Sequence, residues 1–216
     1  MILERFENLN LSKELHRAVR ELEFDEMTPI QAKTIPLILE GRDVIGQAQT
    51  GTGKTLAFGL PILESIHPRA KKPQVIVLCP TRELAIQVAA ELQSVLKYRK
   101  EIIILPVYGG QPIDRQIRTL NAGAHVVIGT PGRTIDHIKR GTLKLENVRT
   151  VVLDEADEML NMGFIDDVEQ ILQYVPQERQ TLLFSATMPR PILNLTRKYQ
   201  SDPEFVKVVH QQLTVP

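Results

Sequence analysis

Two short segments of this 216-residue chain carry residue types that could bind and cleave a nucleoside triphosphate. Residues 48–55 read Ala-Gln-Thr-Gly-Thr-Gly-Lys-Thr, and residues 154–157 read Asp-Glu-Ala-Asp. Each segment follows an apolar run, which predicts that both lie at the carboxyl ends of strands, where open α/β sheets bind ligands. Together they predict a nucleotide-binding α/β domain.

The first segment is typical of a phosphate-binding loop. Its small residues let the backbone approach anionic oxygens, and a helix starting near Gly53 would direct free N–H groups toward them. Lys54 is expected to reach the β- and γ-phosphates, and the Thr55 hydroxyl to ligate Mg²⁺. Alternatively, the segment is a Gly/Thr-rich turn that caps an ordinary helix. The residues expected to bind nucleotide are Ala48, which stands where the general pattern has glycine, and Gln49, Thr50, Gly51, Thr52, Gly53, Lys54 and Thr55.

The acidic segment could supply the metal contact and the base for hydrolysis. A carboxylate at the end of a strand, here Asp154, suits a water-mediated magnesium contact. Glu155 is expected to position the attacking water or act as general base. Alternatively, Asp154 caps a helix whose N-terminus the other acids stabilise. The expected catalytic residues are Lys54, Asp154, Glu155 and Asp157.

Composition is that of a soluble globular protein, with 43% hydrophobic and 24% charged residues. The one cysteine, Cys79, lies in an apolar run and is expected to be buried in a strand, which fits a reducing compartment and a cytoplasmic protein. No apolar run approaches the roughly 18 residues of a membrane span, and the start lacks the pattern of a secretory signal. With 26 basic and 26 acidic residues, any nucleic-acid site must be a local patch.

Apolar runs alternate with amphipathic helical segments along the chain, which predicts an α/β fold: a mostly parallel sheet with helices on both faces, joined by right-handed crossovers. A helix is expected over 82–98. Ser12 is expected to cap a first helix whose buried stripe is Leu15, Ala18, Val19 and Leu22, and Thr28 a second helix with Pro29 at its first position. The expected strands are 44–46, 75–79, 102–107, 125–129, 148–153, 181–184 and 204–209.

Seven segments in this order resemble the first RecA-like domain of the DEAD-box ATP-dependent RNA helicases, of prokaryotic type. The resemblance covers essentially the whole chain. It implies a RecA-like P-loop fold, ATP or ADP with Mg²⁺ as ligands, RNA as partner, and the domain organisation 1–40 (helical segment with the adenine-recognition Q motif, part of the same domain), 41–209 (ATP-binding domain) and 210–216 (start of an interdomain linker). The matching segments are Phe6 with 24–31, 48–55, 80–83, 109–110, 130–133, 154–157 and 185–187.

The resemblance implies that Gln31 reads adenine and that Phe6 stacks on the base. A glutamine amide can accept from the exocyclic amine and donate to N7, a geometry that favours adenine over guanine by roughly 1–3 kcal/mol. Alternatively, Gln31 completes a capping box with Thr28, and the two roles are compatible. The local match is weakened because the family usually has glycine and proline where this chain has Glu23 and Met27.

Three further segments look like those that hold RNA in this family. Arginine side chains can pair with phosphates, helix N-termini offer further donors, and adjacent glycines allow close backbone approach. Such contacts read the backbone, so little sequence specificity is expected. Alternatively, each segment is a cap or a turn. The residues are Pro80, Thr81, Arg82, Gly109, Gly110, Thr130, Pro131, Gly132 and Arg133.

Ser185, Ala186 and Thr187 follow an expected strand. The resemblance implies that their hydroxyls bond to Asp157 and couple the nucleotide state to RNA binding. On local chemistry alone, Thr187 could equally cap a helix ahead of Pro189.

The resemblance also implies a second RecA-like domain whose arginines complete the ATP site. We expect the chain to be a monomeric fragment without membrane contact that binds adenine nucleotide, hydrolyses it very slowly and does not unwind RNA. Local strand separation would require both domains. Two other hypotheses remain: a DNA-directed helicase or other P-loop ATPase, and an RNA clamp that holds ATP without useful turnover.

Overall fold

The computed structural model describes residues 4–209, and within them the chain forms one seven-stranded sheet in which every neighbouring pair is parallel. The strand order is β3-β4-β2-β5-β6-β1-β7. All seven expected strands are present, most of them shorter than expected at one or both ends. Their bounds are β1 Val44–Gln47, β2 Val75–Leu78, β3 Ile104–Val107, β4 Val126–Gly129, β5 Thr150–Leu153, β6 Gln180–Ser185 and β7 Glu204–Lys207.

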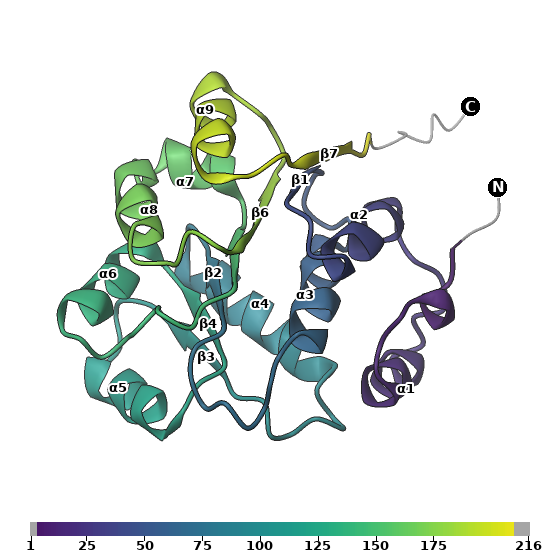
Figure 1. Cartoon of the computed structure of the whole chain (residues 1–216), viewed down its shortest axis with the longest axis horizontal. Helices are drawn as coiled ribbons and strands as arrows, with labels where there is room; N and C mark the ends of the chain where they lie inside the picture. Colours follow the sequence, from purple (N-terminus) through teal and green to yellow (C-terminus); the bar gives the residue numbers. More distant parts are fainter. Residues whose placement is uncertain (1–3, 210–216) are drawn as a thin grey trace.

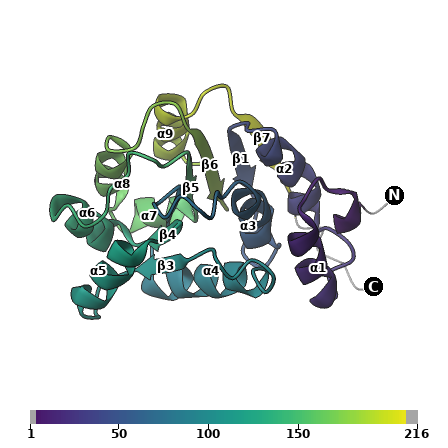
Figure 2. The same ribbon diagram turned by 60° about the horizontal axis from the view of Figure 1, so that its bottom comes forward.

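Helices cover both faces of the sheet (Figures 1 and 2). The helices α1 to α4 contribute to one buried cluster and α5 to α9 to another, so the two groups lie on opposite faces. The bounds are α1 Lys13–Glu21, α2 Pro29–Leu39, α3 Lys54–Glu64, α4 Arg82–Ser94, α5 Ile113–Ala122, α6 Pro131–Lys139, α7 Ala156–Asn161, α8 Ile165–Leu172 and α9 Arg190–Tyr199, with a short 3-10 helix η1 at Phe6–Asn8.

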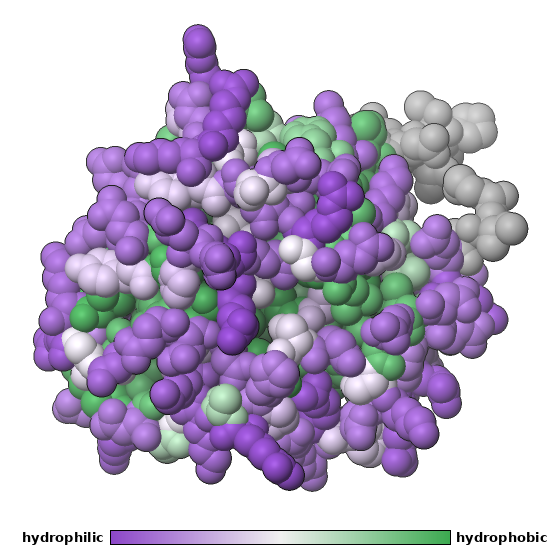
Figure 3. Space-filling view, viewed as in Figure 1, coloured by the Kyte–Doolittle hydropathy of each residue, from purple (hydrophilic) through white to green (hydrophobic). Residues whose placement is uncertain are grey.

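The central strands supply both clusters because successive residues of a strand point to opposite faces. In β2, Val75 and Val77 pack against α1 to α4, whereas Ile76 and Leu78 pack against the other group. Burial on both faces explains why these strands are continuous apolar runs instead of alternating ones. The outer surface seen in Figure 3 is mostly hydrophilic, with apolar residues in small scattered areas.

Two helix predictions need correction. Leu22 does not belong to the buried stripe of α1: it follows the last helical residue and is 37% exposed, while Leu15, Ala18 and Val19 are buried. The helix expected over 82–98 ends at Ser94, and the chain continues through a turn. The Ser12 cap is confirmed, because its hydroxyl accepts the Leu15 N–H at 3.4 Å.

The described part of the expected segment 1–40, residues 4–40, packs into the same buried cluster as α3 and α4, whereas residues 1–3 and the expected linker at 210–216 lie outside the described residues. Cys79 is buried, as expected, but it directly follows β2 and does not belong to the strand. Among the helices of residues 4–209, none has the length and apolar character needed to cross a membrane.

Candidate active site

The sheet order separates the expected nucleotide and RNA segments along one edge. The phosphate loop, the coupling segment 185–187 and the acidic segment lie at the ends of β1, β6 and β5, which are adjacent strands. The three RNA segments follow β2, β4 and β3, which are the next three. Parallel strands all end at the same edge, so every one of these segments lies there. The register pairs Gln47 with Ser185 and Leu78 with Leu153, which aligns the strand ends.

The phosphate loop joins the end of β1 to the start of α3 through two left-handed glycines. Gly51 has φ +78° and Gly53 has φ +82°, a region that favours glycine. Gly53 occupies the N-cap position of α3 and no side chain caps the helix, so the N–H groups of its first turn are directed at the loop without a side-chain acceptor. This geometry is that of an anion cradle and lacks the capping bond of an ordinary Gly/Thr-rich turn.

Gln31 joins α2 to this loop. Its Oε1 accepts the Thr28 backbone N–H at 2.9 Å, and its Nε2 donates to the Gly53 carbonyl at 3.0 Å. The cap role is therefore confirmed for Gln31, although the Thr28 hydroxyl has no hydrogen-bond partner within residues 4–209. An amide oxygen accepts twice and an amide nitrogen donates twice, so one acceptor site and one N–H remain for an adenine edge.

Replacing Gly53 by alanine should weaken ADP binding and lower the free energy of unfolding by about 1–3 kcal/mol. A Cβ at this position would meet Gln31 Nε2 at 2.5 Å in addition to the strain of the left-handed backbone. Gly51→Ala is the matched control, since a Cβ there meets no atom within 4 Å. Chemical denaturation and calorimetric ADP titration would measure both variants. Equal losses for the two would show that the contact with Gln31 is unimportant.

Lys54 faces the acidic segment across the edge of the sheet. Its Nζ lies 3.2 Å from Asp154 Oδ1 and 3.4 Å from Glu155 Oε1, and the residue is only 6% exposed. Burial alone would lower the pKa of the Lys54 ammonium, but the two carboxylates outweigh it and raise that pKa above its ordinary value. Lys54 is thus held as a buried cation beside the phosphate loop.

Asp154 is a buried carboxylate whose oxygens lack hydrogen-bond donors among the described residues, as expected of a residue that binds a cationic ligand. It is fully buried, and apart from the ion pair with Lys54 neither oxygen accepts a hydrogen bond within residues 4–209. Burial raises the pKa of the Asp154 carboxyl group, and the Lys54 ammonium opposes the rise only in part. These orphaned oxygens fit a hydrated Mg²⁺ held jointly with a nucleotide. The described residues contain no cluster of three or more His, Cys, Asp or Glu that would hold a metal alone.

The alternative role of Asp154 as a helix cap is wrong, because Glu155 occupies the N-cap position of α7 and makes no capping bond. Glu155 has φ +49° and ψ +53°, a left-handed conformation that non-glycine residues rarely adopt. Strain of this kind costs on the order of 1–3 kcal/mol and is common at functional sites. It directs the Glu155 carboxylate toward Lys54 and the phosphate loop.

Asp157 connects the acidic segment to the segment after β6. Its Oδ2 accepts the Thr187 hydroxyl at 2.9 Å and the Thr187 backbone N–H at 3.1 Å, and its own N–H donates to Ser185 Oγ at 3.1 Å. The expected bonds between the two segments are present. Thr187 does not cap α9, whose N-cap residue is Pro189. Ala186 takes no part in these bonds; its carbonyl accepts from Gln47 Nε2, at the end of β1, at 3.3 Å.

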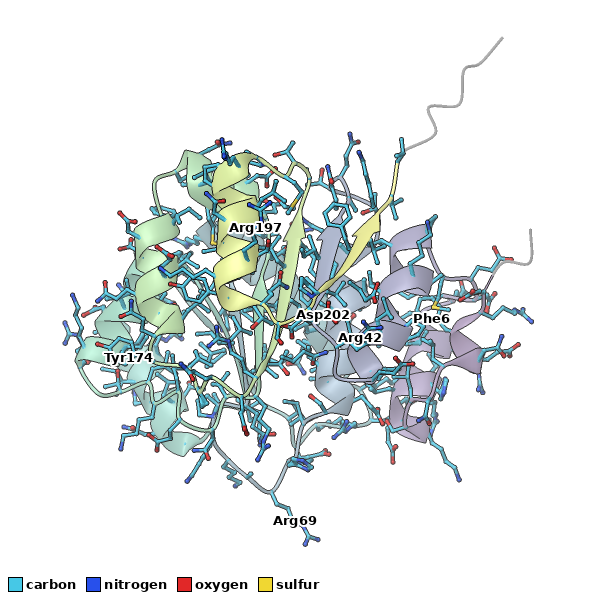
Figure 4. All side chains as sticks on the ribbon, turned by 45° about the horizontal axis from the view of Figure 1, so that its top comes forward. Phe6, Arg42, Arg69, Tyr174, Arg197 and Asp202 are labelled. Carbon is cyan, nitrogen blue, oxygen red and sulfur yellow. The ribbon has the colours of Figure 1, made fainter. Side chains whose placement is uncertain are left out.

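Phe6 does not offer a stacking surface in this structure. It lies in the N-terminal segment (Figure 4), is 3% exposed and belongs to the buried cluster beneath α1 and α2. A nucleobase could stack on its face only if this segment moved. The stacking role therefore stays a prediction, and burial of an apolar ring explains the position of Phe6 without it.

The expected RNA residues surround the ends of β2, β3 and β4. Arg82 is exposed at the start of α4, with its guanidinium 5.0 Å from the centroid of the Tyr108 ring. Arg133, in the first turn of α6, donates through Nη1 to the Gln111 carbonyl at 3.1 Å and to Gln116 Oε1 at 3.3 Å. Of the cap alternatives, Thr81 caps α4 with its hydroxyl and Thr130 makes no side-chain cap.

The remaining expected RNA positions are backbone or small-residue positions at the same strand ends. Gly109 and Gly110 are exposed, and because both are glycines no Cβ obstructs the approach of a ligand. Gly110 has φ +84°, a left-handed conformation that favours glycine. Pro80 precedes α4, and Pro131 and Gly132 form the first turn of α6. The structure brings all three segments together at one edge of the sheet.

Two residues that contact the expected RNA segments were not predicted from the sequence, Tyr108 and Gln116. Tyr108 directly precedes the glycine pair and contacts Arg82, and an aromatic residue at that position was a usable signal. Gln116 is polar, but it lies between Ile113 and Leu120 on the apolar side of an amphipathic helix, and that spacing was a usable signal of burial.

Comparison with known proteins agrees with this geometry. The profile of the DEAD/DEAH box helicase family matches residues 28–195. The DEAD-box ATP-dependent RNA helicase CshA of Geobacillus kaustophilus (strain HTA426) is 60% identical over 211 residues, which cover 98% of this chain and 45% of the relative. CshA of Bacillus subtilis (strain 168) is 57% identical over 210 residues, which cover 97% and 42%. The chain therefore spans less than half the length of these two curated relatives.

The fold matches as well. The crystal structure of a DEAD box protein from the hyperthermophile Methanococcus jannaschii superposes with a TM-score of 0.91 at 50% identity, covering 95% of this chain and 56% of that one. The parallel sheet with helices on both faces is thus the expected RecA-like fold.

Proposed function

The chain belongs to the DEAD/DEAH box helicase family, and from that premise we propose that it is the ATP-binding part of an ATP-dependent RNA helicase. ATP or ADP would lie at the loop after β1, and RNA would cross the loops after β2, β3 and β4. A second RecA-like domain outside this chain would close over both ligands. The observation that carries the proposal is the contact of Lys54 with both Asp154 and Glu155 beside an uncapped helix N-terminus.

Four residues at the phosphate loop and the acidic segment have distinct roles in this proposal. On nucleotide binding, Lys54 exchanges its carboxylate partners for the β- and γ-phosphates. Glu155 orients the attacking water and accepts its proton. Mg²⁺, when bound with the nucleotide, neutralises phosphate charge, and Thr55 and Asp154 are the residues that would hold it, Asp154 through water.

The coupling of ATP to RNA would run through Asp157 and Thr187. Asp157 lies three residues from Asp154 and shares its carboxylate with the segment after β6. A change at the phosphates that moves α7 would therefore change the hydrogen bonds at Thr187. Domain closure would then link the two ligands, so that each raises the affinity for the other. Residues 1–40 would act within the same unit, since α1 and α2 pack with α3 and α4.

Competition between ADP and GDP tests the nucleotide assignment. A fluorescent ADP is bound to the unmodified chain and displaced with either nucleotide, and the measurement is repeated with Gln31→Ala. We expect the affinity for ADP to exceed that for GDP by about tenfold or more, and Gln31→Ala to remove this preference. The expected ratio agrees with the roughly 1–3 kcal/mol of base discrimination that a bidentate amide provides.

Gln31→Ala also breaks the cap of α2, but that loss should affect the binding of both nucleotides equally. The ratio of ADP affinity to GDP affinity within one variant is therefore independent of it. Gln31→Glu is the matched control: it keeps the acceptor for the Thr28 N–H and removes the amide donor. Equal competition by ADP and GDP in the unmodified chain would contradict adenine reading by Gln31 and reopen the assignment to other P-loop ATPases.

A further inference from the structure

Gln116 is a buried polar residue that the proposed mechanism does not use. It is 1% exposed, although the other side chains of α5 are half-buried or exposed. Its Oε1 lies 2.7 Å from His137 Nε2 and 3.3 Å from Arg133 Nη1, and its Nε2 donates to the Tyr108 carbonyl at 3.0 Å. Gln116 on α5 thus bonds to two residues of the neighbouring helix α6, Arg133 and His137 (Figures 1 and 2).

These partners leave the Gln116 amide only one orientation. Arg133 can only donate, so the atom facing it must be the amide oxygen, and the nitrogen must face the Tyr108 carbonyl. His137 Nε2 must then carry the proton that it donates to the same oxygen, while His137 Nδ1 lies 2.8 Å from Thr142 Oγ1. Burial, reinforced by the Arg133 charge, lowers the pKa of His137 and favours the neutral imidazole. A flipped amide would oppose donor to donor in a buried site.

The same amide fixes parts of all three segments to which RNA binding is assigned. It holds Arg133 directly, and both Arg133 bonds use Nη1, so Nη2 and Nε have no hydrogen bond within residues 4–209 and can face a phosphate. It holds the Tyr108 carbonyl, and Tyr108 immediately precedes the glycine pair. The Tyr108 ring in turn lies against Arg82.

We propose that Gln116 is a positioning residue for RNA: its buried amide sets Arg133, the Gly109–Gly110 turn and, through Tyr108, Arg82 in one fixed relation. The inference rests on the proposed function, because it assumes that these segments bind RNA. A group held in register before binding loses less freedom on binding, so the amide raises RNA affinity without touching RNA.

The test compares Gln116→Met with Gln74→Met in the 216-residue chain. Methionine keeps the length of glutamine and removes its hydrogen bonds. Gln74 is the matched control, because it is also buried and holds a loop, through the His67 backbone and the Ala70 carbonyl, ahead of β2 and so at the opposite edge of the sheet. Affinity for a fluorescein-labelled single-stranded uridine homopolymer is measured by anisotropy at several salt concentrations, with ADP affinity and thermal stability recorded for each variant.

We expect Gln116→Met to lower RNA affinity about tenfold, as for a lost hydrogen bond to a charged group, and Gln74→Met to leave it unchanged at similar stability and ADP affinity. Arg133→Ala should reduce the slope of log affinity against log salt by about 0.7, the value for one phosphate contact on a single strand, and Gln116→Met should move the slope in the same direction. In the Arg133→Ala background the effect of Gln116→Met should shrink, since coupled residues are not additive, and the part that remains is the one that acts through Tyr108.

Each contrary result has a distinct meaning. Equal RNA affinities for Gln116→Met and Gln74→Met would overturn the positioning role, and a full effect of Gln116→Met in the Arg133→Ala background would overturn the positioning of Arg133. If Gln116→Met lowers ADP affinity as much as RNA affinity, it acts on the fold, and the positioning role is also wrong. An unmodified chain that binds ADP but not the RNA probe even at low salt would overturn the proposed RNA function, and this inference with it.

Discussion

Joining this chain to a second RecA-like domain should raise its rate of ATP hydrolysis by about 10³- to 10⁵-fold, the usual contribution of an arginine finger. That factor corresponds to roughly 4–7 kcal/mol of barrier. Lys54 is the basic residue that the described structure brings against the acidic segment, and both acids already engage it. The arginines expected at this edge, Arg82 and Arg133, follow β2 and β4, with β5 and β6 between these strands and the phosphate loop.

The measurement is single-turnover hydrolysis at saturating ATP, with and without RNA. The chain alone is compared with a fusion to the remainder of the Geobacillus kaustophilus relative, which is 60% identical over the shared part. The control is the same fusion with the arginines of the added domain that face this chain changed to alanine. We expect the chain alone to bind ADP normally and turn over very slowly. RNA-stimulated turnover by the chain alone, within about tenfold of the fusion, would contradict the need for an external arginine.

The sequence predicted the central strands because the inner strands of a parallel sheet are buried on both faces and are therefore continuous apolar runs; the edge strands β3 and β7 are only partly buried. The ends were less well predicted, since pairing with the neighbours decides where a strand stops. Arg149 lies within the expected run 148–153 but belongs to no strand. Gln180 begins β6, where it pairs with Thr150 and its side-chain amide donates to the Ile38 and Arg42 carbonyls. Such long-range contacts leave no local trace in the sequence.

The same reasoning separates the site residues that could be predicted from those that could not. The phosphate loop and the acidic segment are contiguous and require particular residue types, so their spacing identifies them. Gln116 lies on the apolar side of an amphipathic helix, but its polar type gives no hint of its partners, which are 8, 17 and 21 residues away, so only the fold shows what it bonds to. Phe6 is the opposite case: its type suits both stacking and burial, and the structure buries it.

Glu155→Gln should lower the rate of hydrolysis in the fusion protein by about 10²- to 10⁴-fold, the range for loss of a general base, with little change in ATP affinity. Glutamine keeps the size of glutamate and the acceptor oxygen that faces Lys54, but it cannot take a proton from water. The prediction separates the two acids that contact Lys54, because Asp154 is fully buried whereas the Glu155 side chain keeps 20% of its exposure and can reach a water at the phosphates.

Glu158→Gln is the control, because Glu158 is an exposed acid in the first turn of the same helix and its loss removes the same charge. Hydrolysis is measured in single turnovers and ATP affinity by competition, so that chemistry and binding are scored separately. A fall of less than about tenfold for Glu155→Gln would mean that another group activates the water. In that case the strained backbone of Glu155 would serve only to hold Lys54 between two carboxylates, and the strain would be a feature of the ligand-free fold and not of catalysis.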